Sequence, residues 1–193
     1  MATIEQIKQL REETSVGVSD AKKALEASDN DFDKAKDWLR KKGISKAAEK
    51  SSREAHEGYI GSYIHQTGKL GVIVGINCET DFVARTEDFQ AFAHGIAMHI
   101  AAFSPLYVSR DDIDPKELKK VSDEFLEEVK AKPKNIQEQI LKGKLEKYYS
   151  EVCLLDQPFV KDDTVTVGGL LGEMVGKLGE NIKIGKFAKI QIS

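Results

Sequence analysis

The feature that most constrains the fold is a pair of apolar segments separated by a short turn. The first segment, GYIGSYIH at 58–65, alternates along its length, and the second, KLGVIVGINCE at 69–79, is apolar enough to be buried. Alternation with a period of two indicates a β-strand, and QTGK at 66–69 supplies a glycine that suits a hairpin turn. The two segments therefore predict neighbouring antiparallel strands.

The rest of the chain adds mostly helices to this hairpin. Four helices are expected after the hairpin. The first has Thr86 as its N-cap and a stripe of apolar residues at helical spacing, and the next two have Pro115 and Pro133 in their first turns. These helices are expected over 86–103, 115–130, 133–149 and 167–178. An alternating strand at 181–192 closes the chain. Three strands without βαβ repetition predict an α+β fold with a three-stranded antiparallel sheet packed with helices.

The first 43 residues are interpreted as a separate small domain. Apolar spacing predicts three short helices, and the third ends in a cationic turn followed by Gly43, which is typical of a helix C-terminus. Residues 44–57 are mostly polar and lack a strong apolar face, so they are interpreted as a partly helical linker. We therefore expect a three-helix domain at 1–43 and an α+β core domain at 58–193.

The composition argues against several classes of function. The chain has 29 Lys and Arg against 32 Asp and Glu, so no basic surface for nucleic acid is expected. No apolar run approaches the roughly 18 residues of a membrane span. The N-terminus resembles neither a secretory signal nor a transit peptide. Cys78 and Cys153 are expected to pack as buried hydrophobes in a reducing cytoplasm. We therefore expect a cytoplasmic protein that binds neither nucleic acid nor membrane.

The motifs of an enzyme are mostly missing from the sequence. Gly176 and Lys177 are not followed by serine or threonine, as a phosphate-binding loop requires. His94 and His99 are five residues apart, which is the wrong spacing for paired metal ligands on one helix. We therefore expect no catalytic residue, no metal and no cofactor. The glycines of 168–179 fall mostly on one helical face, which favours close helix packing.

A phenylalanine stands where turn chemistry predicts polar residues. Asp81, Phe82 and Val83 lie between the end of a strand and the expected helix cap at Thr86. Phe82 could fold back onto the following helix, for example against Phe89, which the local sequence favours. Alternatively it projects as an anchor for a partner, since buried aromatic side chains dominate interface energies. The residues alone leave both interpretations open.

Several long segments resemble the elongation factor Ts family. LREETSVGVSDAKKAL at 10–25 resembles its N-terminal signature, and NCETDFVAR at 77–85 resembles its second signature. QPFVKD at 157–162 and GENIKIGKFAKIQ at 179–191 are also similar to that family. The resemblance covers nearly the whole chain, with the signatures in the right order. Gly75 departs from the family, which usually has a glutamate there.

The resemblance implies a guanine nucleotide exchange factor rather than an enzyme. Its partner would be elongation factor Tu, the GTPase that delivers aminoacyl-tRNA, and its effect would be faster release of GDP. The three-helix domain is similar to ubiquitin-associated domains, and in this family it docks on the nucleotide-binding domain of the GTPase. The positions that match family contacts there are Arg11, Val18, Ser19 and Lys22.

The resemblance also assigns roles in the core domain. Thr80, Asp81, Phe82 and Val83 match the segment that intrudes near the magnesium and phosphate site of the GTPase. His65 matches a contact position on another domain of that partner. The chain carries one core repeat, like the short family members that pair as homodimers. A three-stranded sheet also leaves edges that need covering, which favours a homodimer independently of the family.

Two other classes of function remain open at this point. An adapter similar to ubiquitin-associated domains would bind partners through residues 3–42 alone and would not affect nucleotide release. An enzyme that binds phosphate at the helix start near Gly168 should bind a nucleotide by itself. Release of labelled GDP from elongation factor Tu, with and without this protein, distinguishes these classes from an exchange factor.

Overall fold

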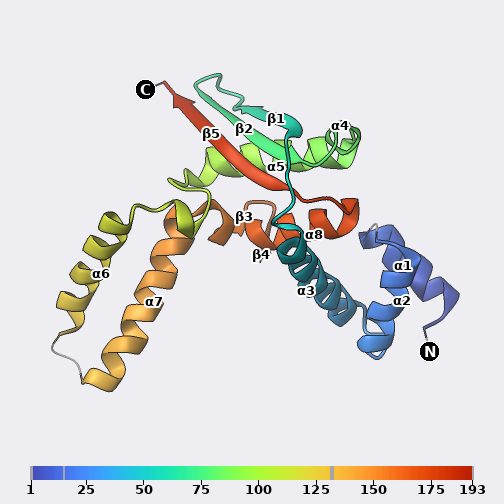
Figure 1. Cartoon of the computed structure of the whole chain (residues 1–193), viewed down its shortest axis with the longest axis horizontal. Coiled ribbons are helices and arrows are strands. Elements are labelled where there is room, and N and C mark those ends of the chain that lie inside the picture. Colours follow the sequence, from blue (N-terminus) through green and yellow to red (C-terminus); the bar gives the residue numbers. More distant parts are fainter. Residues whose placement is uncertain (1, 15, 131–132, 193) are drawn as a thin grey trace.

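The computed structural model describes residues 2–14, 16–130 and 133–192. Helices at the N-terminus lie beside a core of sheet and helices, and a pair of helices projects from that core (Figure 1). In chain order the elements are α1 (Ile4–Thr14), α2 (Val18–Ala27), α3 (Phe32–Lys50), β1 (Glu57–Ile64), β2 (Leu70–Cys78), α4 (Asp81–Ala84), α5 (Glu87–Phe103), the 3-10 turn η1 (Arg110–Asp112), α6 (Pro115–Val129), α7 (Lys134–Val152), the 3-10 turn η2 (Leu154–Asp156), β3 (Pro158–Phe159), β4 (Asp162–Thr166), α8 (Val167–Leu178) and β5 (Lys183–Gln191).

The expected α+β fold with a three-stranded antiparallel sheet is confirmed. The strands lie in the order β1-β2-β5, and both pairs are antiparallel. Gly68 in the hairpin turn has a φ of 68°, a conformation that glycine adopts without strain. Helix α5 packs on one face of the sheet, where every second residue of β2 is buried, from Val72 to Cys78. This helix and the inner face of the sheet form the main core.

The predicted end of the third helix at Gly43 is wrong. Helix α3 continues to Lys50, so the first half of the expected linker is helical. The cationic turn and the glycine are local stop signals, but here tertiary packing overrides them. Gly43 is buried, and α3 packs along α8. The N-terminal part of α3 joins the small core around Leu10 and Leu25, whereas Ala47 packs against the main core.

Two further elements differ from the expectation. A second sheet, of β3 and β4, was not expected, because both of its strands are short and one contains a proline. The turn expected at 81–83 is the short helix α4. The starts of α5 and α6 are confirmed, whereas Pro133 is the N-cap of α7 and not a residue of its first turn. Thr86 accepts a hydrogen bond from the backbone N–H of Phe89 as the N-cap of α5, and Pro115 lies in the first turn of α6.

Helices α6 and α7 form an arm that projects away from the sheet (Figure 1). A charged cluster fastens the base of this arm. The guanidinium of Arg110 donates hydrogen bonds to Glu146 in α7 and to Asp156 in η2, each at 2.7 Å. Within the described ranges, none of the helices is both long and apolar enough to cross a membrane.

Candidate partner-binding site

The candidate site is built where β2 ends and the chain turns into α4. Thr80 adopts an extended backbone conformation, and its hydroxyl oxygen accepts a hydrogen bond from the N–H of Val83 at 3.4 Å. A threonine in this role satisfies a donor that has no partner inside the helix. Ala84 is buried and Val83 packs against the main core. The inner side of α4 is therefore fixed to the body of the protein.

Phe82 lies on the outer side of this short helix. Its side chain is 81% exposed, whereas Phe89 in α5 is fully buried. The interpretation in which Phe82 folds back against Phe89 is therefore wrong. Beside it, the carboxylate of Asp81 forms an exposed ion pair with Arg85 at 2.9 Å. The helix thus presents a large apolar side chain and a charged pair to the solvent.

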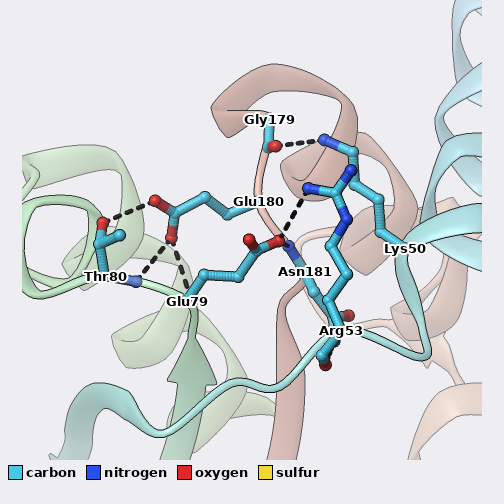
Figure 2. A network of polar contacts seen from close by, with 7 residues as sticks. All are labelled: Lys50, Arg53, Glu79, Thr80, Gly179, Glu180 and Asn181. Atoms are coloured by element: carbon cyan, nitrogen blue, oxygen red, sulfur yellow. Dashed lines mark hydrogen bonds and ion pairs between the residues drawn. The ribbon is translucent and has the colours of Figure 1, made fainter.

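Beside the start of α4, the carboxylate of Glu180 holds the first residues of the helix (Figure 2). One carboxylate oxygen accepts hydrogen bonds from the backbone N–H groups of Glu79 and Thr80, at 3.1 and 3.0 Å. The other oxygen accepts the hydroxyl proton of Thr80 at 2.6 Å. Glu180 lies between α8 and β5, so residues about a hundred positions apart in the sequence meet here.

In a second set of contacts, the acceptor belongs to the β2–α4 connection and the donors come from the other connections. The carboxylate of Glu79 accepts hydrogen bonds from the backbone N–H of Asn181 at 2.6 Å and from Arg53 at 3.4 Å (Figure 2). The Asn181 N–H, followed by the positive charge of Arg53, holds the pKa of Glu79 below its usual value. The side chain of Lys50, the last residue of α3, donates to the carbonyl of Gly179.

The four residues matched to docking contacts lie on the N-terminal helices. Arg11 is in the last turn of α1, and Val18, Ser19 and Lys22 are in the first half of α2. All four side chains are exposed, and Lys22 forms an ion pair with Glu26 at 3.8 Å. Their helices belong to the small N-terminal core, whereas α4 rests on the main core.

His65 lies far from the Thr80–Val83 segment. It follows Ile64, at the opposite end of β1 from Glu57, which pairs with Cys78 at the end of β2. Seven residues of strand separate the two ends, which is about 23 Å at about 3.3 Å per residue. The ring of His65 is exposed and lies 3.0 Å from the hydroxyl of Tyr63. The structure therefore does not bring His65 together with Phe82.

The cysteines are buried, as expected. Burial raises the pKa of the Cys78 thiol and raises that of Cys153 to about 11, so both remain protonated near neutral pH. Among the residues that the structure describes, no group of three or more His, Cys, Asp or Glu side chains is arranged to hold a metal ion.

The sequence reasoning missed the residues that hold the site. Glu79, Glu180, Asn181 and Arg53 come from three different connections, and no local pattern links them. Glu79 lies in the segment at 77–85 and Glu180 and Asn181 lie in the closing segment, so the family resemblance was the available signal for these three residues. The role of the closing segment in holding the start of α4 depends on contacts that only the folded chain reveals.

Comparisons with known proteins agree with the architecture and the signatures. Residues 44–174 match the family model described as elongation factor TS. A curated Elongation factor Ts from Geotalea uraniireducens is 50% identical over 192 residues, which cover 98% of this chain and 89% of the relative. The Elongation factor Ts of Nitratidesulfovibrio vulgaris is 46% identical over 192 residues, which cover 98% of this chain and 96% of the relative.

A third relative extends the agreement. The Elongation factor Ts of Fervidobacterium nodosum is 46% identical over 188 residues, which cover 96% of this chain and 95% of that protein. Similarity of this extent places the chain among the translation elongation factors. Within that class, the chain belongs to the elongation factor Ts family.

Proposed function

We propose that this protein is a guanine nucleotide exchange factor that binds elongation factor Tu and promotes release of GDP so that GTP can bind. The observation that carries the proposal is Phe82, which is 81% exposed on a helix whose inner side is fixed to the core. The protein acts in the cytoplasm and takes part by binding, without making or breaking a covalent bond.

Exchange requires a difference in binding rather than tight binding alone. The factor must bind the nucleotide-free GTPase better than the GDP-bound form. By the same coupling, binding of the factor then lowers the affinity of the GTPase for GDP. Full burial of a phenylalanine side chain is worth about 1.5–3 kcal/mol. At about 1.4 kcal/mol for each tenfold change, burial of Phe82 only in the rearranged GTPase would lower its GDP affinity by roughly 10- to 150-fold.

The other residues of the segment support this action. Thr80 and Val83 fix the helix, so Phe82 is presented without a further change of conformation. Asp81 places a carboxylate next to Phe82, where it can attract donors that otherwise support the magnesium and phosphate site of the partner. Thr80, Asp81, Phe82 and Val83 therefore form the proposed intruding segment.

The N-terminal helices provide the proposed docking surface. Arg11, Val18, Ser19 and Lys22 are exposed and combine positive charge with an apolar side chain. In this proposal the domain at 1–43, similar to ubiquitin-associated domains, docks first on the nucleotide-binding domain of the GTPase. His65, at the far end of the hairpin, contacts another domain of the same partner.

We also propose that the protein is a homodimer. Ile60 and Ile64 in β1, Ile73 in β2 and Ile190 in β5 lie on the face of the sheet opposite α5, and all four are more than half exposed. We call this set the outer isoleucine face. Exposed apolar patches of this kind mark interaction sites, and a second copy of the chain would bury it.

The proposed function is tested by the release of labelled GDP from elongation factor Tu. Catalytic amounts of this protein should accelerate release strongly. An adapter that binds through residues 3–42 would bind the GTPase or another protein without acceleration. A protein that retains labelled nucleotide by itself, in the absence of elongation factor Tu, would support a phosphate-binding function instead.

A further inference from the structure

Three connections of the chain meet beside the start of α4 (Figure 2). They are the β2–α4 connection at Glu79 and Thr80, the α8–β5 connection at Glu180 and Asn181, and the α3–β1 connection at Arg53. Each connection bonds to at least one of the others through a carboxylate or an amide. Two of the three connections, α8–β5 and α3–β1, take no part in the proposed contact with the partner, yet they help to set the orientation of α4.

Glu180 accepts three of these hydrogen bonds. Both of its carboxylate oxygens are used, by two backbone N–H donors and by the hydroxyl of Thr80. Hydrogen bonds to a charged acceptor are stronger than those between neutral groups. A carboxylate that gathers three donors at the entrance of a helix fixes the backbone of both Glu79 and Thr80.

The contact with the hydroxyl of Thr80 has a chemical consequence. A hydroxyl has one proton to donate, and its oxygen has lone pairs that can accept. Because the proton is donated to Glu180 at 2.6 Å, the oxygen of Thr80 is left to accept the N–H of Val83 at 3.4 Å. Glu180 thus assigns Thr80 to the N-cap role that begins α4.

Glu79 completes a reciprocal arrangement. Its N–H donates to Glu180, while its own carboxylate accepts the N–H of Asn181 and a hydrogen bond from Arg53. The side-chain amide of Asn181, which is buried, donates to the carbonyl of Arg53 at 2.7 Å. The two connections therefore hold each other at two points, which resists rotation of α4 about either one.

We propose that Glu180 is a positioning residue for exchange, which holds α4 so that Phe82 projects toward the partner before contact is made. This inference rests on the proposed function of the Thr80–Val83 segment. Burial of Phe82 can drive a rearrangement of the partner only if α4 does not yield instead. A preformed segment also loses less conformational freedom on binding. Glu180 itself acts through Thr80 and Phe82 and does not touch the partner.

The first test measures the protein alone, so it does not depend on exchange activity. Amide hydrogen exchange of Glu79, Thr80 and Val83 should be at least about tenfold faster in Glu180→Ala than in the wild type. The matched control is Glu54→Ala, which removes an exposed carboxylate that follows Arg53 in the sequence and pairs with His56, and which should leave these amides unchanged. Unchanged protection in Glu180→Ala would overturn the positioning role.

The second test measures release of labelled GDP from elongation factor Tu. Glu180→Ala should lower kcat/KM for exchange at least about tenfold, and Glu180→Gln, which keeps one acceptor oxygen, should lose less. In a Phe82→Ala background, Glu180→Ala should lower kcat/KM by less than about a further twofold, because the effects of substitutions that act through one group are not additive. Losses that multiply fully in the double variant would show that Glu180 acts independently of Phe82 and would overturn the proposal.

The two tests separate the inference from the function beneath it. Failure of the wild type to accelerate GDP release would remove the proposed function, whereas the amide measurement would still decide whether Glu180 holds α4. Active wild type together with a Glu180→Ala variant of equal activity would remove the positioning role alone. If Glu180→Ala does not fold, Glu180→Gln carries both measurements, and wild-type values in both would overturn the proposal.

Discussion

Gly43 in α3 and Gly172 in α8 lie so close that a Cβ atom on Gly43 would come within 2.7 Å of the carbonyl oxygen of Gly172. That distance is shorter than real side chains tolerate, and the atom in the way belongs to the backbone. Gly176 lies on the same seam, where an added Cβ would meet the Cα of Gly43 at 3.3 Å. The close contact between the two helices therefore depends on glycine at position 43, and there is little room for a side chain at position 176.

Gly43→Ala should destabilise the protein, since the helices must move apart to admit the methyl group. Such overpacking costs about 1–3 kcal/mol of unfolding free energy. The matched control is Gly143→Ala in α7, where an added Cβ meets nothing within 4 Å. Alanine there should instead stabilise the helix by about 0.5–1 kcal/mol. Urea unfolding of both variants checks the prediction, and equal stability of the two would contradict it.

Phe82→Ala should leave the stability of the protein nearly unchanged and lower its exchange activity at least about tenfold. The side chain is exposed, so its removal leaves no cavity, but the proposed contact loses about 1.4 kcal/mol or more. Phe89→Ala is the contrasting control, because loss of a buried phenylalanine costs about 3–5 kcal/mol of folding stability. Melting temperature and GDP release, measured on the same preparations, decide. A large fall in melting temperature with normal release would refute the anchor role.

Lys22→Glu should slow exchange at low concentrations of the factor and leave the rate at saturation nearly unchanged. Lys22 is exposed, and charge at the rim of an interface affects association more than the bound complex. Lys8→Glu makes the same charge change on the exposed surface of α1, where Lys8 pairs with Glu12. Titration of the exchange rate against factor concentration should separate the two variants, and identical curves would argue against docking through α2.

Ile73→Lys should convert the proposed homodimer into a folded monomer. Ile73 lies in the central strand on the outer isoleucine face, so a charge there would be buried without a partner in the dimer. Ile4→Lys, an equally large change at an exposed position on α1, should leave the dimer intact. Light scattering at micromolar concentration gives the outcome, and a wild-type protein that is already monomeric would remove the idea.

Acidification below about pH 6.5 should reduce the stability of the protein through His99. Nδ1 of the buried ring accepts a hydrogen bond from the N–H of Val160. Nε2 therefore carries the proton, which it donates to the side-chain oxygen of Gln157. Burial lowers the pKa of His99 from 6.5 in the folded state, so the unfolded chain binds a proton more readily. His99 therefore stabilises the fold above pH 6.5, and this stabilisation is lost as the pH falls. In urea unfolding, His99→Gln should lose less free energy of unfolding than the wild type when the pH is lowered. The exposed-site control His56→Gln should lose as much as the wild type.

The sequence predicted the elements whose signals are local and mutually consistent. The alternating strands, the Gly68 turn and the cap at Thr86 each depend on a few neighbouring residues. The one-sided glycines of 168–179 correctly indicated close helix packing. The end of α3 was mispredicted because a glycine after a cationic turn is a common signal for a helix C-terminus. Here Gly43 is needed instead for the packing of α3 against α8.

The candidate site was only partly visible in the sequence. Phe82 could be singled out because an apolar residue at a turn is unusual, but its exposure could not be determined from the sequence. Glu180 was not predicted, because its contacts with Glu79 and Thr80 span about a hundred residues. Nothing in the local sequence distinguishes such a glutamate from one that faces solvent.

Helix α3 is shared by the small N-terminal core and the main core, and this bears on how the two proposed contacts add. If a flexible linker joined the two parts, the second binding site would move within a volume around the first, and its effective concentration would depend on the length of the linker. Helix α3 has 19 residues and a single length of about 28 Å. It therefore keeps the proposed docking surface at a fixed distance from α4. In the proposed complex, a GTPase whose two sites match that spacing would gain both contacts, and one whose domains have rotated would gain only one.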